Sequence, residues 1–149
     1  MINEDLKLRG DVAIVLKDKN GNVKESREIN NLVVTAGLTF ICARMAAASA
    51  DVMSHMALGS GTTAAAAGDT DLESILGSRE ALDSSTASAN TIAYVSSFEA
   101  GEGTGAVTEA GIFNAATSGT MLCHVIFPVV NKQADDTMSV TWTITLTAS

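Results

Sequence analysis

The fold of this chain is decided by residues 138–147, which read Met-Ser-Val-Thr-Trp-Thr-Ile-Thr-Leu-Thr. Every second side chain in this stretch is apolar, and each one between carries a hydroxyl group. Successive side chains of a β-strand point to opposite faces of a sheet, so this period of two predicts a strand with one buried and one hydroxyl-rich face. The apolar positions, which we expect in the core, are Met138, Val140, Trp142, Ile144 and Leu146.

The rest of the chain shows the same kind of pattern in shorter stretches. The pair Asn20-Gly21 separates two such stretches and is a strong hairpin signal, because both central residues of a type I′ turn need a positive φ. This predicts paired strands over 6–17 and 23–29, with a break at Asn30-Asn31. Further strands are expected at residues 32–34, 54–58, 78–83, 91–98, 105–113, 121–130 and 137–147.

One helix is predicted, from Leu38 to about residue 48, with Thr35 as its N-cap. Its apolar stripe has the helical spacing i, i+3, i+4 and i+7, at Leu38, Ile41, Cys42 and Met45. Only Arg44 is charged, so we expect most of the helix circumference to be covered by the sheets or by a neighbouring subunit. Residues 69–76 are expected to form one or two helical turns.

These elements predict an all-β protein, an antiparallel β-sandwich of about seven to eight strands with one short helix. A length of 149 residues fits a single domain over 1–149. Hydrophobic residues make up 46% of the chain but aromatic residues only 4%, which suits packing between sheets better than a large aromatic-lined ligand pocket. Residues 1–30 form an N-terminal hairpin with most of the basic charge, and we expect it to be a docking arm.

The charge pattern argues against nucleic-acid binding. The net charge is −8, and after residue 30 the chain carries three basic residues, Arg44, Arg79 and Lys132, against eleven acidic ones. Binding to phosphates needs clustered Lys and Arg. The polar N-terminus does not read as a signal peptide, and no stretch approaches the ~20 apolar residues that cross a bilayer. We therefore expect synthesis in a cytoplasm, with Cys42 and Cys123 as reduced, buried thiols.

No motif predicts a catalytic, cofactor or metal site. Residues 59–63, Gly-Ser-Gly-Thr-Thr, resemble a phosphate loop but lack its lysine, so a flexible surface loop is expected. His55 and His124 lie in apolar segments without a serine-elbow motif and are expected to be structural. Four acidic residues are expected to be solvated turn carboxylates, namely Asp69, Asp71, Asp135 and Asp136.

Glu109 stands apart, because it lies inside a predicted strand between Val107 and Ile112. A carboxylate there needs a strand edge or a basic partner, and Arg79 and Arg44 are the candidates. We interpret it as structural, since no second acid or base suggests proton transfer. The residues that we expect to determine the structure and its assembly are Asn31, Glu109, Phe113, Trp142 and Ile144.

Several segments, taken in order, resemble small structural proteins of bacteriophages. Residues 31–38, Asn-Leu-Val-Val-Thr-Ala-Gly-Leu, resemble a signature that precedes a short helix in those proteins, and residues 55–63 resemble their glycine-threonine loop. The stretch from Asp71-Leu72 to Arg79 resembles a further element of the family. The order and rough spacing extend over residues 30–147.

Residues 108–114, Thr-Glu-Ala-Gly-Ile-Phe-Asn, are similar to the core of tail-fibre attachment domains, which also carry a downstream Phe-Pro and lysine, as at Phe127-Pro128 and Lys132. Thr108 stands where those domains usually have arginine, and no fibre shaft follows before Ser149. The resemblance implies a non-enzymatic virion structural protein without cofactors, a tail or neck fibre or adaptor subunit.

Two alternatives stay open. A capsid decoration (cement) protein on the phage head is favoured by the small size and the missing shaft. A carbohydrate-binding surface module would need an exposed aromatic platform. For the virion protein we expect a homo-oligomer, with a trimer fitting a fibre or a local three-fold of a capsid, bound to other virion proteins of the capsid, neck or tail.

Overall fold

The structure of the protein is a computed structural model, which describes residues 5–46 and 51–148. These residues form nine strands and one helix. In chain order the elements are β1 (Leu6–Lys17), β2 (Val23–Val33), α1 (Thr35–Met45), β3 (His55–Gly59), β4 (Glu80–Ala81), β5 (Ser84–Ser88), β6 (Thr91–Phe98), β7 (Gly105–Phe113), β8 (Met121–Lys132) and β9 (Thr137–Ala148).

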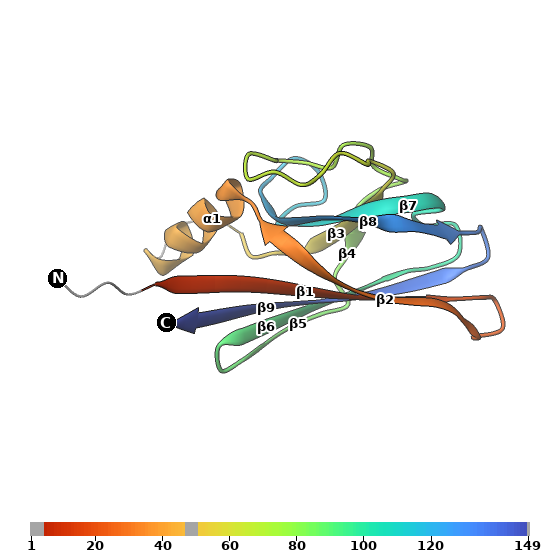
Figure 1. The fold of residues 1–149 in the computed structure, drawn as a ribbon, viewed down its shortest axis with the longest axis horizontal. Helices are drawn as coiled ribbons and strands as arrows, with labels where there is room; N and C mark the ends of the chain where they lie inside the picture. Colours follow the sequence, from red (N-terminus) through yellow and green to blue (C-terminus); the bar gives the residue numbers. More distant parts are fainter. Residues whose placement is uncertain (1–4, 47–50, 149) are drawn as a thin grey trace.

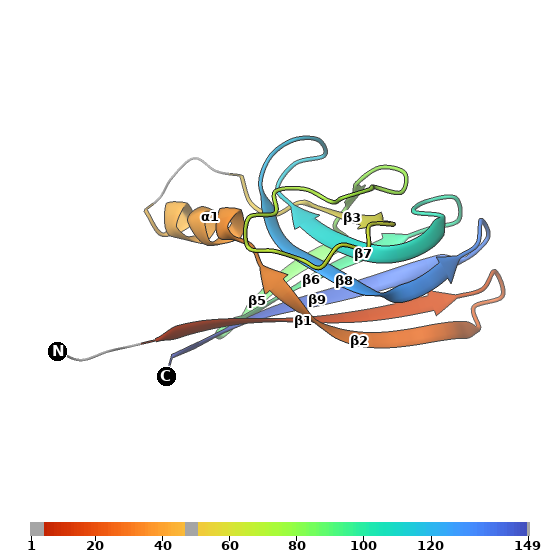
Figure 2. The ribbon, with the colours of Figure 1, turned by 45° about the horizontal axis from the view of Figure 1, so that its top comes forward.

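The strands form one curled, antiparallel sheet in the order β4-β3-β7-β8-β2-β1-β9-β6-β5. The sheet folds over into two layers, and β2 belongs to both (Figures 1 and 2). Most of β2 pairs with β1, whereas its last residues, Leu32 and Val33, pair with β8. The predicted all-β antiparallel fold with one short helix is confirmed, and the two layers are halves of one continuous sheet.

The main core lies between the two layers. The predicted inward face of β9 is confirmed, because Trp142 is fully buried and the alternate residues are partly exposed. Tyr94 of β6 and Ile14 of β1 lie in the same core as Trp142. The opposite layer contributes apolar side chains of β3, β7 and β8, including Met56, Leu58, Val107, Ile112, Cys123, Val125 and Phe127.

The β1–β2 hairpin closes differently from the predicted turn. Gly21 has a φ of 83°, but Asn20 is not among the non-glycine residues with positive φ. The loop is therefore not a type I′ turn, which needs both. Asp18 holds it instead, because its carboxylate accepts hydrogen bonds from the backbone N–H groups of Asn20 (2.8 Å) and Asn22 (3.0 Å).

The predicted strand break at Asn30-Asn31 is wrong, because β2 runs through it. Asn31 pairs with Gly10 of β1, and a Cβ on residue 10 would overlap the Asn31 side chain. The glycine makes room for the asparagine, so the strand continues. The exposed edge strand β5 was not predicted, because Ser84–Ser88 has no apolar alternation.

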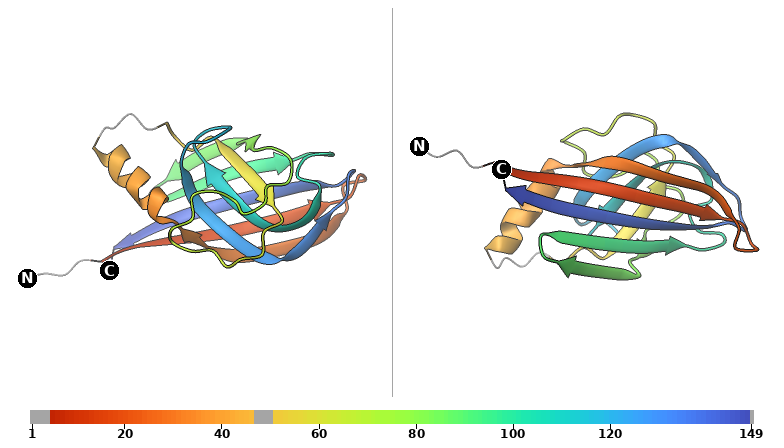
Figure 3. Two further views of the ribbon diagram at one scale, coloured as in Figure 1. Left: turned by 90° about the horizontal axis from the view of Figure 1, so that it is seen from above. Right: turned by 60° about the horizontal axis from the view of Figure 1, so that its bottom comes forward.

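The helix begins earlier than predicted and is less covered. Thr35 is its first residue rather than its N-cap, which is Val34, without a side-chain cap. Of its residues only Gly37 is buried, so the sheets do not cover most of the helix. It lies past the end of the layer of β3, β7 and β8, at the end of the molecule where β1 begins and β9 ends (Figure 3). Residues 47–48, the predicted end of the helix, lie outside the described part of the chain.

No helix among the described residues is long and apolar enough to cross a membrane.

Trp142→Ala should lower the free energy of unfolding by about 3–5 kcal/mol, because it leaves a cavity in the main core. Urea or thermal denaturation measures this loss. Thr141→Ala, on the opposite face of the same strand, is the matched control and should change stability by less than about 0.5 kcal/mol. An equal loss in both variants would contradict the assignment of the two faces.

Candidate functional site

The most unusual side chain of the structure is Glu109, a fully buried carboxylate on β7. It lies beside an irregularity of the β7–β8 pair, where Val107 pairs with Val130 but Glu109 pairs with Ile126. The extra residues belong to β8, around Pro128, as expected for a proline inside a sheet. Glu109 lies under the long connection between β3 and β4, which covers the outer face of this layer.

Glu109 accepts four hydrogen bonds. Its Oε1 accepts from the backbone N–H groups of Gly61 (3.0 Å) and Ser74 (2.8 Å), and its Oε2 accepts from the N–H of Glu73 (3.1 Å) and from Nε2 of His124 (2.9 Å). Burial raises the pKa of Glu109, but these hydrogen bonds outweigh burial, and the net pKa lies below the ordinary value of 4.5. The carboxylate is therefore ionised in a site closed to water.

His124 joins Glu109 to a second carboxylate. Its Nδ1 lies 2.7 Å from Oδ2 of Asp69, and its side chain is only 4% exposed. The backbone N–H of Ala66 donates to the same Asp69 oxygen, and this bond, followed by that of His124, lowers the pKa of Asp69. Each ring nitrogen of His124 thus lies within hydrogen-bond distance of a carboxylate oxygen.

Two glycines of the covering loop are explained by the same carboxylate. A Cβ on Gly59 would lie 2.5 Å from Oε1 of Glu109, and one on Gly61 would lie 2.6 Å from it. Thr108 adds a further bond from its hydroxyl to the carbonyl oxygen of Gly61, at 2.6 Å. Both glycines are buried, so the prediction of a flexible surface loop at residues 59–63 is wrong for its first half. We call Asp69, His124 and Glu109, with the loop residues they bind, the carboxylate–histidine clasp.

The predicted arginine partners of Glu109 are wrong. Arg79 donates to the carbonyl oxygens of Ala115 (2.9 Å) and Ser118 (2.6 Å) and lies over the ring of Phe113, 3.6 Å from its centroid. Phe113 itself is buried in a second, smaller core on the outer face of this layer. The predicted helical turns at residues 69–76 are also absent from the described structure, since Glu73 and Ser74 direct their N–H groups to Glu109 instead.

A second pair of buried charged residues, Lys132 and Asp136, lies at the turn between β8 and β9. Nζ of Lys132 donates to the carbonyl oxygens of Glu99 (2.9 Å) and Asp136 (2.7 Å), and burial lowers its pKa. The Asp136 carboxylate lies 2.7 Å from Nζ of Lys24, which lowers its pKa. Asp136 is 4% exposed, so its prediction as a solvated carboxylate is wrong. These bonds join the β6–β7 and β8–β9 turns to each other and to the start of β2.

The five predicted structural residues do not form one site. Trp142 and Ile144 lie in the main core, Glu109 and Phe113 lie on the outer face of the other layer, and Asn31 lies beside Gly10. His124 was missed as the partner of Glu109, and Asp69 as the partner of His124. Pairing of Gly111 with His124 makes Glu109 and His124 diagonal neighbours on one face, which depends on a register that the sequence does not reveal.

The geometry of the histidines does not indicate acid–base catalysis. Both nitrogens of His124 are already bound to carboxylates. Nδ1 of His55 lies 2.8 Å from Oγ of Ser54, but within residues 5–46 and 51–148 no carboxylate orients this ring. Nor do the described residues contain a group of three His, Cys, Asp or Glu side chains that could hold a metal ion.

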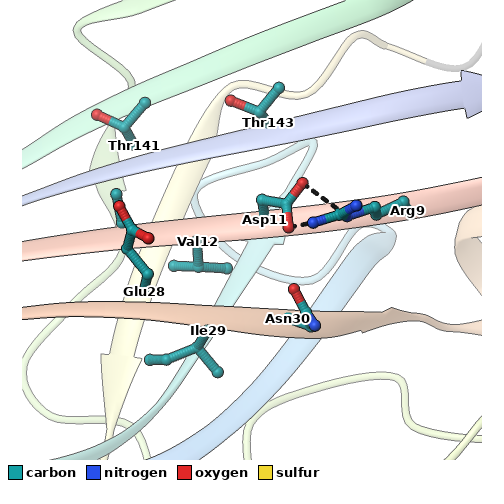
Figure 4. Close-up of a pocket in the computed structure, with 9 residues that line it drawn as sticks. Arg9, Asp11, Val12, Glu28, Ile29, Asn30, Thr141 and Thr143 are labelled. Carbon is teal, nitrogen blue, oxygen red and sulfur yellow. Dashed lines mark hydrogen bonds and ion pairs between the residues drawn. The ribbon is translucent and has the colours of Figure 1, made fainter.

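A shallow groove of about 450 Å³ lies on the outer face of β2, β1 and β9 (Figure 4). Its polar lining includes Asp11, Glu28 and Thr141, and Asp11 is paired with Arg9 at 3.0 Å. No aromatic side chain lines it. In the described part of the chain no aromatic residue is exposed, so the stacking platform that a carbohydrate-binding module needs is missing there.

Comparisons with known proteins add no assignment: no family model, curated protein or solved structure matches this chain.

Glu109→Gln should lower the free energy of unfolding by about 3 kcal/mol, because an amide nitrogen replaces an oxygen that accepts buried hydrogen bonds. Chemical denaturation measures the loss. Glu28→Gln, an exposed site on β2, should change stability by no more than about 0.5 kcal/mol. A Glu109→Gln variant as stable as the wild type would show that the clasp contributes nothing.

The clasp should also make stability depend on pH. Folding lowers the pKa values of Glu109 and Asp69, so their contribution is complete above the ordinary values of 4.5 and 3.8 and is lost as the pH falls through the folded values. We expect the free energy of unfolding to decrease between about pH 5 and pH 3, with a smaller decrease in Glu109→Gln than in Glu28→Gln. Identical pH profiles would rule out this role for Glu109.

Proposed function

We propose that this protein is a non-enzymatic structural subunit of a bacteriophage particle, in which it serves as a tail or neck fibre or adaptor subunit. On this proposal it acts in the virion as a homo-oligomer bound to other virion proteins. The observation that carries the proposal is the way in which the segments that resemble phage structural proteins meet in space.

Those segments lie far apart in the sequence but contact one another in the clasp. Gly59 and Gly61 come from the glycine-threonine loop, Glu73 and Ser74 from the element that ends at Arg79, and Glu109 from the attachment-like core. The resembling segments thus meet at one buried carboxylate, that of Glu109. This contact supports the interpretation that the resemblance reflects a shared structural unit and is not a set of unrelated short matches.

Arg79 and the segment after β2 extend the same unit. Arg79 lies over Phe113, so the two resembling elements that contain them are in contact. The N–H of Thr35 donates to the carbonyl oxygen of Ala67 at 2.8 Å, and a Cβ on Gly37 would overlap the Leu122 carbonyl oxygen. The Thr-Ala-Gly stretch at residues 35–37 therefore contacts both the β3–β4 connection and β8.

The exposed face of the sheet supports a role in contacts with other proteins more than a role in catalysis. The outer face of β5, β6 and β9 is uncharged and rich in small hydroxylated side chains, which include Thr86, Thr91, Ser97, Ser139, Thr141, Thr143 and Thr145. Such a flat face suits broad contact with another protein surface. It also favours the second candidate, a decoration protein that lies on a capsid.

The hairpin that we predicted to be a docking arm, residues 1–30, is part of the folded sheet where the structure describes it. β1 lies between β2 and β9, and its inward side chains Val12, Ile14 and Leu16 are buried in the core. The hairpin is thus an integral part of one layer. Docking through residues 1–30 would use the outward side chains of the hairpin and the turn around Gly21.

Gold-labelled antibodies against the protein, applied to purified particles of the source phage, test the proposal. We expect label at the neck or tail, and antibody pre-absorbed with the pure protein provides the control. Label spread over the head would replace the adaptor role with the decoration role. Particles without label would overturn the virion proposal.

A further inference from the structure

Helix α1 is apolar but poorly covered. Its sequence, Thr-Ala-Gly-Leu-Thr-Phe-Ile-Cys-Ala-Arg-Met, has one charged residue, yet only Gly37 is buried. Gly37 anchors the first turn against the backbone of Leu122, and the rest of the helix extends past the layer of β3, β7 and β8 (Figures 1 and 3). A helix with so few polar residues is normally covered on most sides.

The exposed apolar side chains of α1 form a regularly spaced stripe along the helix. Phe40 and Ile41 turn toward the main core and pack against it in part. Leu38, Cys42 and Met45, at i, i+4 and i+7, are exposed, with exposed fractions of 42% for Leu38 and 81% for Met45. The stripe that the sequence predicts as a core face is thus largely open to solvent.

We call the three exposed side chains of this stripe, Leu38, Cys42 and Met45, the helix-end surface.

The area of this surface fits the apolar part of one subunit interface. Its side chains, with neighbouring apolar atoms of α1, present on the order of 300 Å² of apolar surface, the size of the largest patch on some monomers. A standard interface covers about 800 Å² on each partner, of which about 60%, or roughly 500 Å², is apolar. The helix-end surface therefore supplies more than half of the apolar contact of one interface.

The charge distribution favours a second copy of the chain as the occupant. The acidic excess lies outside α1, in the loop with Asp69, Asp71 and Glu73 and in the turns with Glu99, Glu102 and Asp135. The helix itself has no acidic residue and one basic residue, Arg44. Two copies of a chain with a net charge of −8 can therefore meet helix against helix without bringing acidic side chains of the two helices together.

We infer that α1 is the interface between copies of this chain, and that the helices of neighbouring copies pack stripe against stripe about a symmetry axis. A spacing of i, i+4 and i+7 is that of the seam along which helices pack against identical helices. A closed symmetric arrangement uses the same patch on every copy. This inference names the self-association surface of the proposed virion subunit, and its biological role rests on that proposed function.

Light scattering coupled to size-exclusion chromatography tests the inference on the full chain. The wild type should have a mass that is a multiple of the monomer mass. Leu38→Asp and Met45→Asp should weaken association by about 100-fold or more, because each places a charge in the apolar contact. Val129→Asp is the matched control, since Val129 of β8 is 44% exposed, close to the 42% of Leu38, but lies outside the helix-end surface. This variant should keep the wild-type mass.

Thiol reactivity provides a second readout, which is measured on the wild-type protein itself. Cys42 is exposed in the single chain, whereas Cys123 is buried and burial raises its pKa to about 12, so only Cys42 should react with a thiol reagent. Packing between copies should slow the reaction of Cys42 about ten-fold or more relative to a folded, monomeric Met45→Asp protein. Circular dichroism checks that this variant is folded.

Several results would overturn the inference. They are a wild type that stays monomeric up to about 100 µM, an oligomer that survives both aspartate substitutions, and equal Cys42 reactivity in oligomer and monomer. The inference and the proposed function fail separately. Unlabelled phage particles with an intact α1-dependent oligomer would remove the virion role alone, and labelled particles with a monomeric protein would remove the interface alone.

Discussion

The buried carboxylate of Glu109 is the constraint on which one half of the structure depends. A carboxylate closed to water is costly unless its oxygens are fully bonded, and here three backbone N–H groups and one imidazole meet that need. Those donors come from two separate parts of the long β3–β4 connection and from β8. The carboxylate therefore requires a loop without regular secondary structure to lie in one place, and it also requires glycine at residues 59 and 61, where a side chain would displace it.

The other half of the structure rests on strand alternation. β1, β6 and β9 turn one row of apolar side chains inward and leave the other row to solvent, so this layer needs no cover on its outer face. The layer of β3, β7 and β8 is covered on both faces, by the main core inside and by the clasped loop outside. β2 connects these two environments within a single strand. Charge is sparse on the outer face of β5, β6 and β9 and is concentrated in the β1–β2 hairpin, the loops and the turns.

Sequence patterns predicted much of the fold but only the isolated members of the clasp. Trp142 and Ile144 were placed correctly because a period of two has one physical interpretation in a strand. Glu109 was recognised as a carboxylate that needs a partner, and His124 as a structural histidine. Their partnership, and that of Asp69, was missed because it depends on the β7–β8 register and on a loop that returns from a distant part of the chain. The two arginines offered as partners matched by charge, but Arg79 is held elsewhere by carbonyl oxygens and the Phe113 ring.

The sequence by itself determined the local properties of this protein: the alternating strands, the all-β antiparallel class, the single apolar helix and the absence of a basic cluster. Each of these follows from the spacing of side chains along a short segment. Only the tertiary structure decided the joining of two layers through β2, the four donors on Glu109 and the exposure of the helix stripe. The physical reason is that hydrogen bonds to a buried carboxylate and the covering of an apolar face depend on which distant segments pack beside them. The spacing of residues along one segment carries no information about which distant segments these are.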